Sequence, residues 1–367
     1  MRLLHVHSGN RYGGVESVLR VMARYNSSVQ SAFALSFDGR LANEIRAAGG
    51  EVHILGEVRA SRPVSVLRAR SNLFALLREH PCDATMVHSA WTLSLLAYSP
   101  KSPLVFYQHD IFKGDHWTEK LARHVHPDLI LANSAFTAQT TSYVFPGRRA
   151  LVVYPPAPLP VEALAAGERL AIRAQHAVPN EAVVILIAAR FEKWKGHGLL
   201  LEALALLRQN PLWHLWIAGE PQNASERQFR ECLHVTAAGL GLHSRVQFLG
   251  HVSNVPALMQ AADIYSQPNT GPEPFGLTFV EAMASGLPIV ATPLGGVREI
   301  LEPVWGLLAA PKPSDVAAML ERLLEDASLR ARLGQLGRAH ARELCDPETQ
   351  IAAIGRNIAL LLNRKAA

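Results

Sequence analysis

The first 150 residues repeat a pattern of short apolar runs followed by longer segments whose apolar positions recur every three to four residues. The first unit is an apolar run over 2–7, a turn at Gly13-Gly14 and an amphipathic stretch from Val18 to Met22. This order predicts a strand, a turn and a helix. Further strands are expected at 31–36, 51–55, 84–88, 104–108 and 129–132, with helices such as 64–79 between most of them. Alternating strands and helices predict a parallel, doubly wound sheet.

The alternation stops at 154–160, where the sequence YPPAPLP places four prolines in seven residues. Proline continues neither a helix nor a central strand, so a domain boundary is expected here. The pattern then restarts, with strands expected at 183–188, 215–218, 246–249, 263–267 and 289–292, and helices at 199–207 and about 277–285. Two long helices, about 313–325 and 347–363, close the chain.

These elements predict the α/β class, with two doubly wound, Rossmann-like domains facing a central cleft. The expected domains are 1–155 and 156–345, followed by a last helix over 346–367 that returns to the first domain. Ligands of such sheets bind at the carboxyl ends of the parallel strands. Functional side chains are therefore sought where strands end.

Composition narrows the class of protein. Of the 367 residues, 49% are hydrophobic and 18% are charged, which supports a sizeable core and excludes disordered and fibrous proteins. The longest strongly apolar run, 182–189, is far shorter than the roughly 20 residues of a membrane span. The N-terminus reaches Ser8-Gly9-Asn10 before an apolar signal region accumulates, so we expect a cytoplasmic chain without a signal peptide.

Cysteine and arginine usage adds two expectations. Cys82, Cys232 and Cys345 are odd in number and far apart, which favours buried thiols over a disulfide framework or a zinc site. The formal net charge is +5, and only seven of the 36 basic residues are lysines. Arginine recognises phosphate and carboxylate groups with a planar pair of donors. The arginine excess indicates either codon bias or recognition of such groups.

The most informative segment is 273–292, EPFGLTFVEAMASGLPIVAT. Glu273 lies in the loop before a predicted helix, Gly276 stands at the start of that helix, and Glu281 lies one to two turns inside it. A helix N-terminus offers N–H groups, here from Gly276 to Thr278, to an anion, and a carboxylate accepts hydrogen bonds from a vicinal diol such as a ribose. The alternative is that both glutamates only favour the helix dipole.

A second group of residues follows the predicted strand 183–188. Arg190, Lys193 and Lys195 come after the strand, and Gly196 marks the turn into the next helix. Two cations at the carboxyl end of a strand suit a diphosphate, because charge-assisted hydrogen bonds contribute about 1.5–3 kcal/mol each. The alternative is a solvated basic loop.

Two glycine pairs and one histidine complete the candidates. Gly13-Gly14 and Gly295-Gly296 each lie between a strand and a helix, but neither fits the Gly-x-Gly-x-x-Gly fingerprint and no P-loop motif occurs, which disfavours dehydrogenases and P-loop kinases. Either pair taken alone can be a plain turn. His109 follows the strand 104–108, where it can hydrogen-bond a polar ligand. Its spacing from the nearby His116, His124 and His126 fits no common zinc arrangement, so no metal site is expected.

Together these residues resemble the retaining glycosyltransferases of family 4, which have the two-domain GT-B fold. The resemblance rests on the Glu-x7-Glu pattern of Glu273 and Glu281 with AMASGLP after it, on Arg190 with Lys195-Gly196, on Gly13-Gly14 and on His109. It runs in order over nearly the whole chain. The string QPNTGP at 267–272 departs from the Pro-Ser that the family often has before its first glutamate.

The resemblance implies a nucleotide-sugar held by the second domain. It implies that Arg190 and Lys195 contact the diphosphate, that Glu281 binds the ribose hydroxyls, and that Glu273 and His109 lie against the donor sugar. The Gly13-Gly14 loop is then expected to approach the diphosphate from the first domain. Four residues at the start of the helix join the expected donor-binding set, namely Phe275, Gly276, Leu277 and Thr278.

The expected reaction needs no cofactor beyond a UDP-sugar or GDP-sugar donor. It needs no metal, because fixed cations and N–H groups can stabilise the departing diphosphate. The expected acceptor is a hydroxyl of a glycan, a lipid-linked molecule or a small molecule. Alternatives are an inverting transferase or an epimerase with the same fold, or a non-catalytic phosphate- or nucleic-acid-binding protein. The scattered basic residues argue against nucleic acid.

Basic residues gather on one predicted helix of the first domain and on its approach, namely Arg59, Arg62, Arg68, Arg70 and Arg78. Such a run can face an anionic lipid-linked acceptor or a membrane surface. The alternative is a solvated helix face. Peripheral membrane association, at the inner face of the membrane, is therefore one expectation for this helix.

Overall fold

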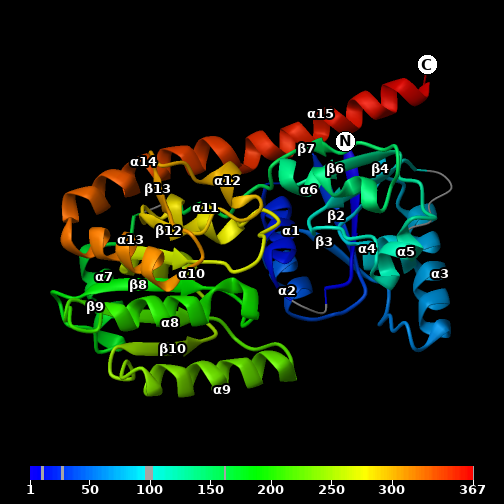
Figure 1. The fold of residues 1–367 in the computed structure, drawn as a ribbon. Helices are drawn as coiled ribbons and strands as arrows, with labels where there is room; N and C mark the ends of the chain where they lie inside the picture. The colour runs from blue at the N-terminus through cyan, green and yellow to red at the C-terminus, as the bar shows by residue number, and fades with distance from the viewer. Residues whose placement is uncertain (10–11, 26–28, 96–101, 161–162, 367) are drawn as a thin grey trace. The chain divides into compact units, whose positions relative to one another are not determined.

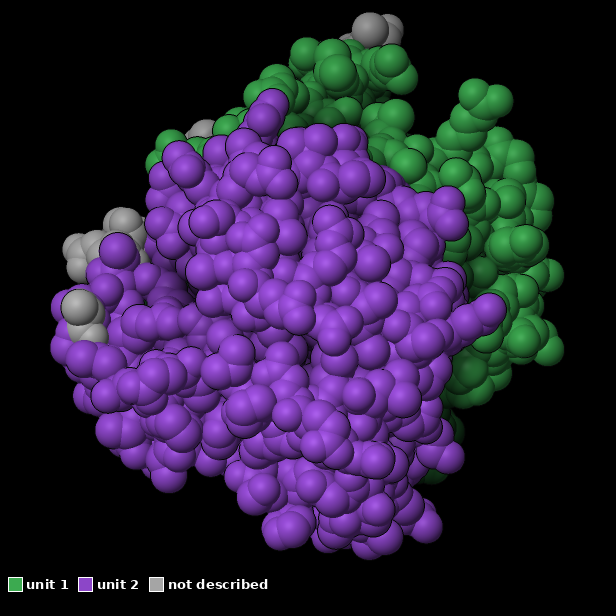
Figure 2. Space-filling view, turned by 60° about the vertical axis from the view of Figure 1, so that its left-hand side comes forward, with its two compact units in different colours: residues 1–158, 345–367 green, residues 159–344 purple. Residues whose placement is uncertain are grey.

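The computed structural model of the chain describes residues 1–9, 12–25, 29–95, 102–160 and 163–366. The chain divides into two compact units, which Figure 2 colours green and purple. The first unit comprises Met1–Pro158 with Cys345–Ala367, and the second comprises Leu159–Leu344. The sequence analysis places the corresponding boundaries at 155 and 345.

The described part of the first unit forms a seven-stranded parallel sheet in the order β3-β2-β1-β4-β5-β6-β7. Helices connect the strands, as Figure 1 shows. The strands are β1 (Arg2–His7), β2 (Gln30–Leu35), β3 (Glu51–Ile54), β4 (Ala84–Val87), β5 (Leu104–Gln108), β6 (Leu129–Ala132) and β7 (Leu151–Val152). The helices are α1 (Gly14–Arg24), α2 (Arg40–Ala47), α3 (Pro63–Glu79), α4 (Ala90–Leu95), α5 (Trp117–Ala122) and α6 (Ala135–Gln139), with a 3-10 turn η1 (Thr141–Tyr143).

Burial explains why the apolar runs located these strands. All five residues of β5 are buried, and so are the last five of β1. A parallel strand covered by helices on both faces is apolar at nearly every position instead of alternating. Strand β7 lies at the edge of the sheet with both residues exposed, so it has no such run and was not expected.

The described part of the second unit contains a six-stranded parallel sheet in the order β10-β9-β8-β11-β12-β13. Its strands are β8 (Val183–Ala188), β9 (Trp213–Ala218), β10 (Val246–Gly250), β11 (Ile264–Gln267), β12 (Ile289–Ala291) and β13 (Gly306–Leu308). Its helical elements are α7 (Ala166–Gln175), η2 (Lys193–Lys195), α8 (His197–Leu206), α9 (Ala224–Gly239), α10 (Val255–Ala261), α11 (Leu277–Ala284), α12 (Val297–Ile300), α13 (Pro313–Glu325) and nearly all of α14 (Ala327–Cys345). Apolar residues of β8, α8 and α13 form the main core of this unit.

Two long helices of this unit, α9 and α14, were missed by the sequence analysis. Only Leu233 and Ala237 of α9 are buried hydrophobic residues, so the helix has no long apolar stripe. Helix α14 contains glycines, which argue against a helix from sequence alone. A Cβ at Gly334 would lie 2.1 Å from the Gly286 carbonyl oxygen, so this glycine lets α14 approach the loop after α11.

The last helix, α15 (Pro347–Ala366), belongs to the first unit. The Ala157 N–H donates to the Cys345 carbonyl at 3.1 Å, and the Lys365 ammonium pairs with the Asp128 carboxylate at 2.5 Å. A Cβ at Gly355 would lie 2.9 Å from Val29. These contacts join the end of the chain to the first sheet and its helices.

Two further expectations concern membrane spans and thiols. None of the helices in the described residues has the length and apolar character needed to cross a bilayer. Cys345 is buried and Cys82 is half-buried, but Cys232 is exposed on α9. The expectation of buried thiols is therefore wrong for Cys232, because α9 turns that face to solvent.

Candidate functional site

The second sheet reverses its strand order between β8 and β11, which are neighbours although far apart in sequence. Doubly wound sheets bind ligands at such a point, outside the carboxyl ends of the strands. Strand β8 leads into Arg190 and η2, and β11 leads into Asn269 and Glu273. The two predicted groups of site residues thus leave adjacent strands at the same edge.

The structure brings Lys195 and Glu273 together. The Lys195 ammonium donates to both carboxylate oxygens of Glu273, at 3.0 Å to Oε1 and 2.7 Å to Oε2. The two side chains are 15% and 7% exposed. The ammonium also lies 4.1 Å from the centre of the Trp194 ring, a cation–π contact. The sequence analysis named both residues but did not predict their pairing.

Amide side chains that were not predicted as site residues complete the surroundings of Glu273. Gln267 and Asn269 donate to Glu273 Oε2 at 3.2 Å and 3.0 Å. The Gln267 carbonyl oxygen accepts in turn from the hydroxyls of Tyr265 at 2.8 Å and Thr278 at 3.3 Å. Burial, followed by the charges of nearby glutamates, raises the pKa of Tyr265. The Glu273 carboxylate is therefore an acceptor held on one side by fixed donors.

Glycines allow the three loops at this edge to touch. Gly196 has φ 83°, and a Cβ there would lie 2.0 Å from the Pro268 carbonyl oxygen. A Cβ at Gly295 would lie 2.3 Å from the Glu273 carbonyl oxygen, and the Gly296 N–H donates to that oxygen at 2.8 Å. The Gly295-Gly296 pair is thus more than a plain turn, because it holds the Glu273 loop by its backbone.

Helix α11 begins beside this loop. Gly276 is its N-cap with φ 107°, a left-handed conformation that favours glycine. No side chain among the described residues caps the helix, and the first N–H groups of a helix have no partner within it. Leu277 and Thr278 form the first turn, and Phe275, immediately before the cap, is buried. The half-buried Glu281 lies further along the same helix, as its spacing predicted.

Arg190 is placed differently from Lys195. Its guanidinium pairs with Glu192 at 2.7 Å, and the side chains are 35% and 25% exposed. Arg190 is therefore a partly open cation at the end of β8, whereas Lys195 is enclosed.

In the first unit, the loop after β1 carries Gly13 and Gly14 at the start of α1. Gly13 is extended, and a Cβ there would make only an ordinary contact of 3.6 Å with Glu16; a Cβ at Gly14 would meet no described atom within 4 Å. Nearby, the buried His7 Nε2 bonds the Glu16 carboxylate at 2.8 Å. The described fold makes no steric demand for glycine at either position.

His109 follows β5 and is the last ring of a buried histidine chain. His88 Nδ1 lies 3.1 Å from His109 Nε2, and His5 Nδ1 lies 3.0 Å from His88 Nε2. Burial lowers the pKa of His5 and of His109 to about 3, and it lowers that of His88 well below its usual value. These rings are therefore uncharged at neutral pH. The sequence analysis named only His109 because its partners come from other strands.

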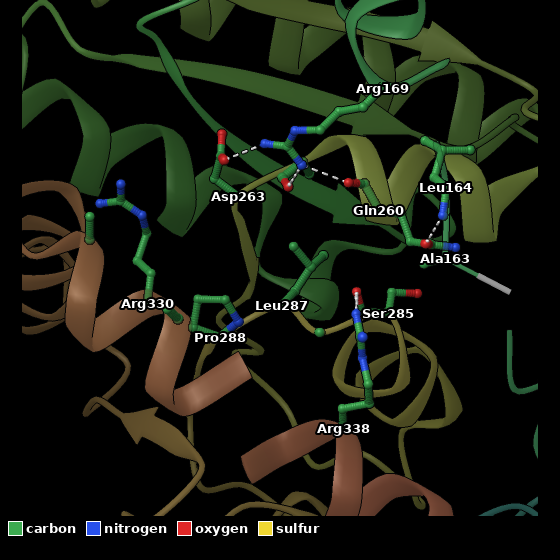
Figure 3. Close-up of a pocket in the computed structure, with 14 residues that line it drawn as sticks. Ala163, Leu164, Arg169, Gln260, Asp263, Ser285, Leu287, Pro288, Arg330 and Arg338 are labelled. Atoms are coloured by element: carbon green, nitrogen blue, oxygen red, sulfur yellow. Dashed lines mark hydrogen bonds and ion pairs between the residues drawn. The ribbon is translucent and has the colours of Figure 1, made fainter. Parts of the chain in front are cut away.

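A separate pocket of about 410 Å³ lies at the amino ends of strands β11 and β12, away from the carboxyl ends where Lys195 and Glu273 lie. Figure 3 shows Arg169, Arg330 and Arg338 around it, with Asp263 and Pro288, which directly precede β11 and β12. Arg169 pairs with Asp263 at 2.6 Å, and Arg338 donates to the Ser285 carbonyl at 3.0 Å. These arginines hold backbone and side chains together. Among the described residues there is no group of three or more His, Cys, Asp or Glu that could hold a metal.

Residues 168–340, most of the second unit, match the family model described as Glycosyl transferases group 1. A D-inositol 3-phosphate glycosyltransferase of Geodermatophilus obscurus is 34% identical over 225 residues, which cover 58% of this chain and 48% of that protein. One of the same name from Corynebacterium urealyticum is 26% identical over 310 residues, 76% of this chain and 72% of that protein. The chain thus spans about half the length of the first relative.

Solved structures share the whole fold. The Anabaena protein HepE in complex with UDP-glucose superposes with a TM-score of 0.86 and 26% identity over 98% of this chain and 99% of that chain. Sucrose-phosphate synthase from Thermosynechococcus elongatus gives a TM-score of 0.79 and 18% identity over 99% of both chains. The expected fold class, two Rossmann-like α/β domains of the GT-B type, is confirmed. The family match, the named relatives and this fold together support a glycosyltransferase enzyme.

Proposed function

We propose that the chain transfers a sugar from a nucleoside-diphosphate sugar to an acceptor hydroxyl with retention of configuration, as a family 4 enzyme whose Glu-x7-Glu pair is Glu273 and Glu281. The observation that carries the proposal is the enclosed Lys195–Glu273 pair beside the uncapped start of α11, at the point where the second sheet reverses. A cation and a row of N–H groups bind phosphate oxygens. The adjacent carboxylate binds sugar hydroxyls.

Lys195 is suited to bind the leaving diphosphate while it stays paired. An ammonium has three N–H donors, and two of them point at Glu273. The third can donate to a phosphate oxygen. When the bond between the sugar and the phosphate breaks, negative charge grows on the diphosphate, and the preorganised Lys195, Arg190 and N–H groups of Gly276, Leu277 and Thr278 stabilise it. The departing phosphate then takes the proton of the acceptor hydroxyl, which attacks from the same face of the sugar.

Glu273 has acceptor capacity left for the sugar. Its Oε2 accepts from Lys195, Gln267 and Asn269, whereas within the described residues its Oε1 accepts from Lys195 alone. A carboxylate oxygen accepts about two hydrogen bonds. Oε1 is therefore the atom we assign to a hydroxyl of the donor sugar, while Glu281, further along α11, binds the ribose.

Gly13 and Gly14 are proposed to admit the diphosphate from the first unit. The described fold does not require glycine at either position, since a Cβ would meet no close contact there. A glycine that the fold does not need is consistent with close approach of a ligand to the backbone. His109 is proposed to donate to or accept from the donor sugar.

The acceptor is proposed to be a hydroxyl of a glycan, a lipid-linked molecule or a small molecule, and α3 to be the surface that meets a membrane or a lipid-linked acceptor. Val64 and Leu67 on α3 are 67% and 63% exposed, and Arg62 and Arg68 beside them are exposed as well. Apolar and basic side chains on one helix favour an anionic interface. Arg70 takes no part, because it donates to the Ser94 carbonyl at 3.4 Å. The cytoplasmic location stays a prediction.

The proposal is tested by incubating the full chain with a panel of UDP-sugars and GDP-sugars and measuring the melting temperature and the release of nucleoside diphosphate. One donor should raise the melting temperature, because a ligand that binds only the folded state stabilises it, and should be turned over. Turnover should persist after exhaustive chelation with EDTA, since no cofactor or metal is proposed. Loss of turnover in EDTA with recovery in Mg²⁺ contradicts the metal-independent mechanism, and tight, steeply salt-dependent binding of random DNA without turnover favours a nucleic-acid-binding protein.

A further inference from the structure

Four polar side chains that lie in, or directly after, four adjacent strands form a continuous buried chain in the first unit. Ser31 on β2 contacts His5 on β1, with 3.2 Å between Ser31 Oγ and His5 Nε2. His5 contacts His88, which follows β4, and His88 contacts His109, which follows β5. The order β2-β1-β4-β5 in the sheet places these residues in a row across its middle. All four are at most 7% exposed.

The chain couples the protonation of one ring to that of the next. An uncharged imidazole carries one N–H, on Nδ1 or on Nε2, and in a contact between two rings one nitrogen must donate and the other accept. If His5 Nδ1 donates to His88 Nε2, then His88 Nδ1 carries the hydrogen that is donated to His109 Nε2. If the first contact is reversed, every later contact reverses with it. The three rings therefore have two concerted arrangements, and a ring cannot change tautomer alone.

Packing holds the rings in the positions that the chain requires. The His5 ring stacks on Phe33 at 5.1 Å and on His88 at 5.2 Å, and the His88 ring stacks on His109 at 5.4 Å. Both ring nitrogens of His5 and of His88 are used within the chain. His109 uses Nε2, which leaves Nδ1 as the nitrogen that the chain does not occupy.

We propose that Ser31, His5 and His88 are positioning residues that hold His109 in one orientation and in one of the two concerted arrangements, because His109 changes tautomer only if His88 and His5 change with it. Its Nδ1 then presents one hydrogen-bonding character to a sugar hydroxyl of the donor. The hydrogen bond on one imidazole nitrogen sets which proton state the other shows. A partner that already has the correct orientation and tautomer loses less free energy when the transition state forms. The role of Nδ1 toward the sugar rests on the proposed function, whereas the locking of the tautomer does not.

The lock is tested first on the wild-type chain, with ¹⁵N-labelled histidine and long-range ¹H–¹⁵N spectra at neutral pH. A locked, uncharged ring shows one protonated and one unprotonated nitrogen, whereas a ring that exchanges between tautomers shows two averaged signals. We expect His109 to be locked in the wild type and averaged in His5→Phe, which keeps a ring to stack on Phe33 and His88. Averaged signals of His109 in the wild type, or a locked His109 in His5→Phe, overturn the proposal.

Kinetics supply the second readout. His5 lies beyond His88 and does not contact His109 among the described residues. We expect His5→Phe to lower kcat about ten-fold, the lower end of the loss found when a metal-binding histidine loses its orienting partner. Affinity for the free nucleoside diphosphate should be unchanged. The matched control is His53→Phe on β3. Among the described residues His53 bonds Glu51, at 2.9 Å, its ring lies 5.2 Å from that of His80, and it contacts no member of the histidine chain. Equal kcat values in His5→Phe and His53→Phe contradict the proposal.

Ser31→Ala is the gentler variant if His5→Phe does not fold, since it removes one hydroxyl at the far end of the chain and leaves all three rings. It should also convert the His109 signals from locked to averaged, and unchanged signals in Ser31→Ala overturn the proposal. If the wild type turns over no nucleotide-sugar, the proposed function fails, but the spectra still decide whether the histidine chain locks His109.

Discussion

The Lys195–Glu273 pair makes a quantitative prediction, because both partners are nearly buried. Lys195→Met keeps most of the side-chain stem but leaves the 7%-exposed Glu273 carboxylate without its cation. Breaking a buried ion pair costs about 3–5 kcal/mol, since the remaining charge stays buried. Gln267 and Asn269 still donate to Glu273 in this variant. The free energy of unfolding should therefore fall by an amount at the lower end of this range, about 3 kcal/mol.

The double variant measures the interaction between the two side chains. In Lys195→Met with Glu273→Gln neither charge remains. Its free energy of unfolding should therefore fall by about 2 kcal/mol less than the sum of the falls in the two single variants, the size of coupling found for residues in contact. Unfolding is followed in denaturant by tryptophan fluorescence, to which six tryptophans contribute, including Trp194 beside the Lys195 ammonium. The matched control is Arg190→Met, which breaks a more exposed pair and should cost about 1 kcal/mol or less.

Strict additivity of the two single losses, with a coupling below about 0.5 kcal/mol, would show that the pair does not persist in solution. The assignment of Lys195 as a cation held by Glu273 would then be wrong. A loss in Arg190→Met equal to that in Lys195→Met would likewise contradict the argument from burial.

The other predictions concern ligand, loop and pH. Glu281→Gln should lower the affinity for free nucleoside diphosphate, whereas Glu273→Gln should lower kcat and leave this affinity nearly unchanged, because only interactions strengthened in the transition state raise kcat. Equal losses of affinity in titrations of the two variants would refute these separate roles. Gly13→Ala should keep its melting temperature but lose kcat/KM, whereas Gly39→Ala, at the matching extended N-cap of α2 with no contact within 4 Å, should change neither. Unfolding free energy should fall with acid, since His5, His109 and His197 have pKa values lowered from 6.5 to about 3 by burial. The unfolded chain binds protons below pH 6.5 and the folded chain does not, so the stability present above pH 6.5 is lost toward pH 3, by about 1.4 kcal/mol per pH unit for each ring. A flat profile in denaturant titrations between pH 7 and pH 4 would show that these rings are not buried uncharged.

Much of the fold could be predicted from the sequence because parallel strands covered on both faces are continuous apolar runs. Strand β8 is buried at every position, and its run, 183–188, was located to the residue. Exposed β7 and polar α9 lacked such patterns and were missed. The glycine at the end of α11, Gly286, has φ 84°, a left-handed conformation that favours glycine after a helix.

The candidate site could be predicted only in part, because its contacts join residues far apart in the chain. The motifs around Lys195 and Glu273 were visible, but the two residues stand 78 positions apart, and no local pattern indicates that they pair. The histidine chain takes its members from three strands, so only the sheet order reveals it. Gln267 and Asn269 stood in the string that departs from the family, and the structure shows them as donors to Glu273.

The most direct test of the proposed reaction is to determine the anomeric configuration of its product. The full chain is supplied with the nucleotide-sugar that it turns over and with a hydroxyl acceptor, and the first product is followed by NMR before it can mutarotate. The proposed mechanism predicts the anomeric configuration of the donor in the new glycosidic bond, with nucleoside diphosphate released in equal amount. An inverted anomer would contradict the assignment of Glu273, Lys195 and the leaving phosphate to a reaction on one face of the sugar.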